Sequence, residues 1–188
     1  MREDQKYSFA YLLGVSAVIV SFSAVLLLGR SITSSASAQD RGSSDSRFAA
    51  NAATGGMAEV KLGQLAEEKA GSEAVKSFGK RMVDDHSKAG EQLKETAREE
   101  NITLPYELNA KDQATYNRLA KLSGSEFDRA YMQVMVKDHE EDVAEFKREA
   151  SDGTNPALKH FAAQTLPTLE DHLKEARDVS ADRKASVQ

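Results

Sequence analysis

Three of the four histidines in the chain directly follow an aspartate. The three pairs are Asp85-His86, Asp138-His139 and Asp171-His172. Imidazole nitrogens and carboxylate oxygens bind ions such as zinc, copper or iron, and a carboxylate can instead orient an imidazole that binds the ion. Metal binding is therefore the first chemistry to weigh against the rest of the sequence.

Helical spacing places these histidines in line with apolar side chains. The apolar stripes run through Phe78, Met82 and His86; through Met132, Met135 and His139; through Phe161, Leu169 and His172; and through Glu59, Leu62 and Ala66. Steps of three and four residues keep side chains on one face of a helix. Four helices thus each send one ionisable group inward, and because an isolated buried charge is costly, each group must be paired, neutral or bound to something.

The register of the helices predicts that these groups meet at mid-bundle. Glu59, His86, His139 and His172 are expected to lie near one another, and Asp138 is a further candidate ligand. One hypothesis is a site for a zinc, copper or iron ion formed by these five residues. The other, which is the primary interpretation, is a satisfied polar network inside a structural, stress-related or partner-binding module.

The aspartates of the pairs are expected to act on other helices. Asp85, Asp138 and Asp171 each point about 100° away from the histidine that follows them, since one residue advances an α-helix by that angle. They are therefore better placed to orient a histidine of a neighbouring helix than to share its metal.

Composition removes several classes of function. The chain has no cysteine, so disulfides and thiolate chemistry are absent. It also lacks a glycine-rich phosphate loop and a nucleophile elbow, so no catalytic residue is assigned, and an enzyme that works without a metal is the least favoured of three interpretations. Its 25 basic and 30 acidic residues are mixed along the same segments. Nucleic acid is therefore not an expected partner, and a transition-metal ion is the one cofactor considered.

The N-terminal segment predicts export. Arg2 and Lys6 precede an apolar stretch over residues 7–28, and the small residues Ala36 and Ala38 follow. This layout is typical of a signal peptide cut after Ala38. The alternative is an uncleaved membrane anchor, because about 22 helical residues span roughly 33 Å. Either interpretation places the rest of the chain in the periplasm or otherwise outside the cytoplasm.

The remaining chain is expected to form one all-α domain. We predict a signal or anchor over residues 1–38, a flexible linker over 39–46, an antiparallel four-helix bundle over 47–180 and a disordered tail over 181–188. Helices are expected over residues 47–70, 72–100, 125–150 and 156–179, with a short extra helix over 110–122 in the long crossover. Their boundaries rest on a cap at Asp45 or Ser46, a cap at Ser72, and an Asn155 cap followed by Pro156.

Two segments of the chain repeat one pattern. They read Ala74-Val75-Lys76-Ser77-Phe78-Gly79 and Ala157-Leu158-Lys159-His160-Phe161-Ala162, and each is followed by an Asp-His pair. The repeat predicts that the first helical hairpin corresponds to the second. Two other features receive structural interpretations: the acidic run Glu140-Glu141-Asp142 as a solvated face, and Gly55-Gly56 as a point of close helix packing.

Several motifs together resemble a known family. They are Gly55-Gly56-Met57-Ala58-Glu59-Val60, the Met-Val-x-Asp-His segments, Phe127-Asp128-Arg129-Ala130-Tyr131 and Leu166-Pro167-Thr168-Leu169. From about residue 48 to 179 the chain is similar to the bacterial family of domain of unknown function 4142. The resemblance implies a ferritin-like four-helix fold, an exported or membrane-associated location and no established activity.

The chain departs from the pattern of di-iron ferritin-like proteins. Those proteins carry Glu-x-x-His on two helices. The residues three before His86, His139 and His172 are valine, valine and leucine. A di-iron oxidase centre is therefore not expected.

Overall fold

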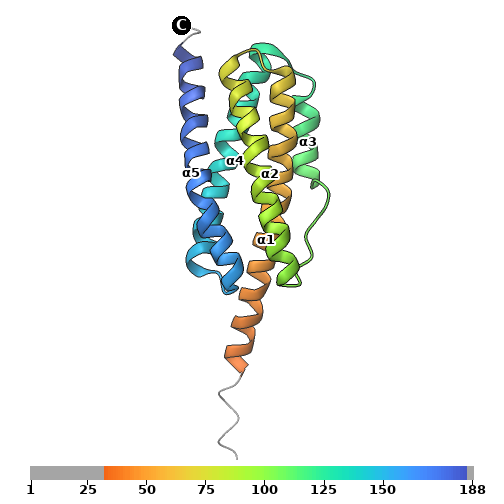
Figure 1. Ribbon diagram of the computed structural model, residues 1–188, viewed down its shortest axis with the longest axis vertical. Helices are drawn as coiled ribbons and strands as arrows, with labels where there is room; N and C mark the ends of the chain where they lie inside the picture. Colours follow the sequence, from red (N-terminus) through yellow and green to blue (C-terminus); the bar gives the residue numbers. More distant parts are fainter. Residues whose placement is uncertain (1–31, 186–188) are drawn as a thin grey trace, which may run out of the picture.

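The computed structural model describes residues 32–185, with side chains over residues 44–181, and within this range the protein is all helical (Figure 1). The helices are α1 (Ile32–Lys69), α2 (Glu73–Glu99), α3 (Ala110–Leu119), α4 (Gly124–Asp152) and α5 (Pro156–Ala185). Helix α1 packs along α2, and α4 packs along α5, while the short α3 lies in the connection between the two hairpins and contacts α1 and α4. The all-α class and the extra helix agree with the prediction.

Helix caps set the two tight turns of the bundle. The Val75 amide donates to the hydroxyl oxygen of Ser72 over 3.4 Å at the start of α2. At the start of α5, the Leu158 amide donates to the side-chain oxygen of Asn155 over 3.0 Å, and Pro156 occupies the first helical position. Both predicted caps are confirmed, because each side chain satisfies an amide that the first helical turn leaves unpaired.

The boundaries of the outer helices differ from the prediction. Helix α1 begins at Ile32, so residues 39–46 are helical rather than a linker, and α5 continues to Ala185, into the predicted tail. Asp45 does not cap α1, because its carboxylate accepts hydrogen bonds from Thr154 in the turn between α4 and α5. The apolar stretch over residues 7–28 lies outside the described residues. Among the described helices, none combines the length and apolar character needed to cross a membrane.

Two buried aspartates tie the hairpins together in the same way. The amides of Gly71 and Ser72 donate to the carboxylate of Asp128 over 2.8 and 3.1 Å. In the other half, Asp45 accepts from the Asn155 amide over 2.8 Å, besides its bonds from Thr154. Asp45 precedes Asp128 by the same number of residues as the Gly71-Ser72 turn precedes the Thr154-Asn155 turn. This reciprocal capping supports the duplication inferred from the sequence.

The core has two hydrophobic clusters, one toward each end of the bundle. The larger members of one are Leu62, Leu65, Phe78, Met82, Phe127, Tyr131 and Met135. Those of the other are Phe48, Leu93, Phe146, Leu158, Phe161 and Leu169. Along every long helix, the inward polar residues predicted from the sequence fall between these clusters. A polar layer therefore crosses the middle of the bundle.

The distance between α1 and α2 changes along their length. A Cβ atom added to Gly63 would lie 2.5 Å from the carbonyl oxygen of Gly79, so the two helices touch there. A Cβ atom at Gly55 would find nothing within 4 Å. The close approach predicted for Gly55-Gly56 is therefore wrong. The glycines that permit it are Gly63, about two turns further along α1, and Gly79 on α2.

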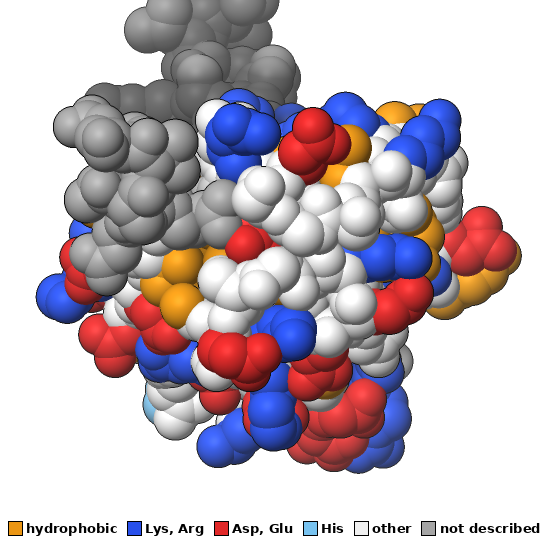
Figure 2. Space-filling model, turned by 90° about the horizontal axis from the view of Figure 1, so that it is seen from above, with side chains coloured by type: hydrophobic (Ala, Val, Ile, Leu, Met, Phe, Trp, Pro, Cys, Tyr) orange, Lys and Arg blue, Asp and Glu red, His pale blue; other side chains and the backbone are white. Residues whose placement is uncertain are grey.

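Charged side chains of both signs share the surface. Figure 2 shows Lys and Arg beside Asp and Glu over one end of the molecule. Ion pairs within one helix also occur, such as Lys80 with Asp84 over 2.7 Å and Lys174 with Asp178 over 2.8 Å. On this end face charge is locally balanced.

Candidate metal centre

Three histidines from three helices meet in the buried polar layer. His86 lies on α2, His139 on α4 and His172 on α5, and their side chains are between 0% and 7% exposed. Their ring centroids are 5.3 to 5.7 Å apart. One ligand atom from each lies within 4.8 Å of the other two. The convergence expected from the helical stripes is therefore present.

Hydrogen bonds assign the protonated nitrogen of His139 and His172. His139 Nδ1 lies 2.9 Å from the carbonyl oxygen of Met135. A carbonyl oxygen only accepts, so His139 carries its proton on Nδ1 and keeps a lone pair on Nε2. His172 Nε2 donates to Oδ2 of Asp85 over 2.8 Å, which leaves the lone pair of His172 on Nδ1.

His86 is oriented in the same manner by a carboxyl group of α1. Its Nδ1 lies 2.9 Å from Oε2 of Glu59. Its Nε2 is buried and has no hydrogen-bond partner. His139 and His172 are thus each held by one nitrogen and left with a free lone pair on the other, and His86 contacts Glu59 through one nitrogen while its other nitrogen has no partner.

The lone pairs of His139 and His172 face each other directly. His139 Nε2 and His172 Nδ1 are 3.3 Å apart. The N–H of His139 donates to the Met135 carbonyl and the N–H of His172 donates to Asp85. Neither ring therefore has a proton between these two nitrogens. Two lone pairs at this distance repel each other unless a proton or a cation lies between them. The distance also equals the edge of a tetrahedron with zinc-to-nitrogen bonds of about 2.0 to 2.1 Å, which is about 3.3 to 3.4 Å.

Burial keeps the three rings neutral. It lowers the pKa of His86 to about 4 and that of His172 to about 3. It also lowers the pKa of His139, against the opposing charge of Glu59. At neutral pH the imidazoles are therefore in the protonation state in which a metal ion binds them.

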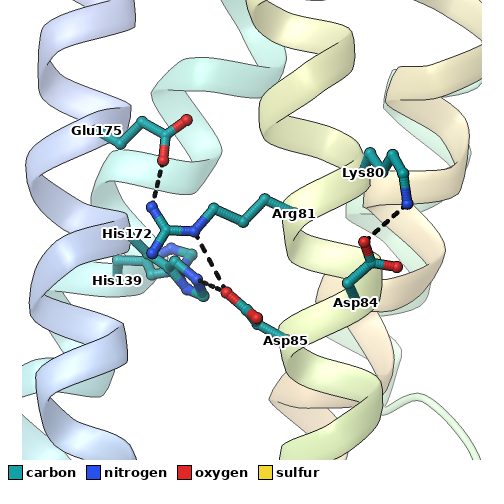
Figure 3. A network of polar contacts seen from close by, with 7 residues as sticks. All are labelled: Lys80, Arg81, Asp84, Asp85, His139, His172 and Glu175. Atoms are coloured by element: carbon teal, nitrogen blue, oxygen red, sulfur yellow. Dashed lines mark hydrogen bonds and ion pairs between the residues drawn. The ribbon is translucent and has the colours of Figure 1, made fainter.

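A charged network on the α2 and α5 surfaces supports His172. Arg81 donates from Nε to Oδ2 of Asp85 over 3.3 Å and from Nη1 to Glu175 on α5 (Figure 3). Burial opposes ionisation of Asp85, but the hydrogen bonds from His172 and Arg81 lower its pKa. Asp85 is thus a fixed carboxylate that orients a histidine of another helix, as the sequence predicted.

Two carboxyl groups complete the polar layer, and one of them was not predicted. Burial raises the pKa of Glu59 to about 7 and raises that of Asp142, which also lies close to Glu59, well above its usual range. Glu59 Oε1 is buried without a hydrogen-bond partner and lies 3.5 Å from His139 Nε2. The interpretation of Glu140-Glu141-Asp142 as a solvated face holds for the two exposed glutamates and fails for Asp142. Its position three residues after His139 was the available signal.

The remaining predicted ligand lies elsewhere. Asp138 is half-buried, and its pKa is raised by burial, with Lys111, Glu141 and Lys137 as charged neighbours. It does not belong to the group of histidines that converge. The structure therefore brings together Glu59 and the three histidines, adds Asp85 and Asp142 around them, and leaves Asp138 toward α3.

Comparison with known proteins identifies one matching family and two solved structures with a similar fold. The family model of domain of unknown function 4142 matches residues 31–179. A solved fragment of a domain of unknown function 305 protein from Deinococcus radiodurans has a TM-score of 0.65 and 14% identity, covering 74% of this chain and 96% of that one. A protein of the same kind from Streptomyces coelicolor, inferred to be secreted, has a TM-score of 0.63 and 16% identity, covering 75% and 94%. At these identities the likeness shows a shared helical fold. A search of curated proteins gave no match.

Proposed function

The chain belongs to the family of domain of unknown function 4142, and we propose that its bundle binds one transition-metal ion through His86, His139 and His172. The observation that carries the proposal is the pair of lone pairs 3.3 Å apart on His139 Nε2 and His172 Nδ1. Both rings are buried, and both are held in this tautomer by acceptors on their other nitrogens.

The donor set favours zinc or copper. Three imidazole nitrogens without any thiolate suit these ions, and Glu59 Oε1 is a buried oxygen close enough to complete or adjust the coordination. Asp85 and the Met135 carbonyl then serve as the outer acceptors that commonly hold metal-binding histidines. The chain lacks the paired Glu-x-x-His motifs of di-iron bundles, so we do not propose an iron oxidase.

We also propose a location and an architecture for this site. The apolar stretch over residues 7–28, with basic residues before it, supports export or anchoring outside the cytoplasm. The similar protein inferred to be secreted agrees with this proposal. The two hairpins and the long connection through α3 support a ferritin-like four-helix arrangement in which the metal sits at mid-bundle.

The metal content of untagged protein tests the proposal. Protein prepared without a histidine tag, incubated with zinc and desalted, is expected to retain one ion per chain by elemental analysis. His139→Leu should lose that ion, whereas His160→Leu, which alters an exposed histidine, should keep it. Circular dichroism shows whether both variants remain folded.

Failure would favour the other interpretation of the polar layer. If folded, untagged wild-type protein retains no zinc or copper, the proposal is wrong. The histidines would then form a polar network within a structural or partner-binding module of the envelope.

A further inference from the structure

A pocket beside the polar layer lies outside the space between the three histidines. Its volume is about 420 Å³, within the range of small-molecule sites. His86 lines it, but His139 and His172 do not. At Gly56, which also lines the pocket, the nearest atom to an added Cβ would be Nδ1 of His86, at 4.0 Å. The pocket therefore reaches His86 on the nitrogen that faces Glu59, and not on the nitrogen left for a metal.

The internal repeat relates this pocket to the histidine cluster. Each histidine of the cluster has a counterpart in the other half of the chain, at the spacing that relates Asp45 to Asp128. The counterparts of His86, His139 and His172 are Leu169, Gly56 and Ala89. All three counterparts line the pocket. The pocket therefore corresponds to the histidine cluster, with the three imidazoles replaced by side chains that are small or apolar.

The two carboxyl groups of the polar layer are counterparts in the same way. Glu59 precedes Asp142 by the spacing of the repeat, and both residues line the pocket. Glu59 lies 2.9 Å from Nδ1 of His86 and 3.5 Å from Nε2 of His139. The counterparts of these two rings carry no side-chain nitrogen. Asp142 therefore lines a space from which the nitrogen-bearing partners of its counterpart are missing.

Glycines and apolar side chains give this space its size and its walls. A Cβ atom added to Gly55 or Gly90 would meet nothing within 4 Å, although both residues line the pocket. Phe146 on α4 and Phe161 on α5 contribute aromatic rings to the lining. A ligand can therefore combine a polar group at Asp142 with an apolar body against these rings.

The charge of the carboxyl groups selects the polar group of the ligand. A hydrogen bond links Glu59 to Asp142, and because two carboxyl groups share one only through a proton, the pair carries at most one negative charge. Within residues 44–181, where side chains are described, neither group forms an ion pair with a lysine or an arginine. Lys61 and Lys94 also line the pocket, but both are exposed, and Lys94 pairs with Glu91 over 2.7 Å. The buried charge therefore lacks a cation of its own.

We propose that the pocket binds a small organic monocation, a primary ammonium with an apolar substituent, whose N–H groups donate to Asp142. The ammonium supplies N–H donors where the repeat lacks its imidazoles, and its single charge balances that of the carboxyl pair. The aromatic rings of Phe146 and Phe161 suit both the substituent and the cation. An anion would face the carboxyl pair, and a neutral molecule would leave its charge unbalanced. This site needs no bound metal, so the inference goes beyond the proposed function.

Calorimetric titration of the full chain with 2-phenylethylamine tests the proposal. The protein is first treated with a chelator, so that the result does not depend on metal binding. At neutral pH, wild-type protein should bind one equivalent of the amine. The uncharged alcohol 2-phenylethanol, which has nearly the same shape, should bind at least tenfold more weakly. Absence of amine binding, or equal affinities for the amine and the alcohol, would overturn the inference and leave the proposed metal binding intact.

Variants of the pocket locate the bound amine. Asp142→Asn keeps the size of the side chain but removes its charge, and it should weaken amine binding about 10- to 100-fold. Gly90→Leu directs a side chain into open pocket space and should abolish binding. Ser77→Leu, which is exposed on the same helix and outside the pocket, should bind as wild type does. Circular dichroism identifies the variants that remain folded, and wild-type affinity in folded Gly90→Leu protein would overturn the inference.

Discussion

Replacing Asp85 by asparagine isolates the role of the carboxylate that orients His172. The change keeps the size of the side chain but removes its charge, and it leaves the ligand nitrogens untouched. The amide can still accept from His172 Nε2, yet it can equally present its NH₂ group, so the histidine is no longer held in the tautomer that frees Nδ1. Arg81 also loses one of its two acidic partners.

The size of the effect follows from the geometry of this contact. Loss of an outer acceptor of a metal-bound histidine typically lowers affinity about 10- to 100-fold, or about 1.4 to 2.7 kcal/mol. The bond to His172 is short, at 2.8 Å. Because the Asp85 side chain is 35% exposed, however, water can make part of the interaction that the variant loses. We therefore expect Asp85→Asn to weaken zinc binding by about tenfold, near the lower limit.

Competition with a chromophoric zinc chelator measures this affinity, and the neighbouring residue provides the control. Asp84 pairs with Lys80 over 2.7 Å on the exposed side of α2, with 60% of its side chain exposed (Figure 3). Asp84→Asn removes the same charge one residue away and should leave zinc affinity unchanged. Equal affinities for the two variants would refute the orienting role of Asp85.

Two further predictions concern stability. Glu149 is buried, and burial together with Asp45 raises its pKa from 4.5 to about 7, against Arg148 and Lys159. Because the pKa of Glu149 is higher in the folded protein than in the unfolded chain, the folded state loses stability as pH rises from 4.5 to 7. Glu149→Gln removes this loss. In urea unfolding, it should therefore raise the free energy of unfolding by up to about 3 kcal/mol at pH 8 and change it little at pH 4. Asp128→Ala and Asp45→Ala should each lower the free energy of unfolding by about 2 to 4 kcal/mol, because each variant leaves buried turn amides unpaired. A large decrease for only one of the two variants would argue against equivalent hairpins.

The helices could be predicted because their signals are local. Ser72 and Asn155 cap the helices that follow them, and apolar periodicity marks the buried faces. Asp45 shows the limit of this reasoning. Its type and position suggested a local cap, but its partners, Thr154 and Asn155, stand at the other end of the sequence. Nothing local in the sequence distinguishes the two uses of an aspartate.

The site was predictable to the same extent. Helical phase indicated which histidines point inward, since phase is a property of one helix. Asp138 was included because it adjoins His139, although one residue turns the side chain by about 100°. Asp142 was missed because two exposed glutamates precede it and the run looked uniformly solvated. Whether a charged residue is buried depends on the helix opposite, which the run itself does not encode.

Folding stability alone does not account for the polar layer. Glu59, Asp142 and the three histidines separate two apolar clusters that could otherwise form one continuous core. Well-packed apolar residues in place of buried ionisable groups are often neutral or stabilising, so these side chains are retained at a cost to the fold. In the metal-free protein that cost includes the facing lone pairs of His139 and His172. Under the proposed metal binding, a cation between these two nitrogens would replace their repulsion by coordination.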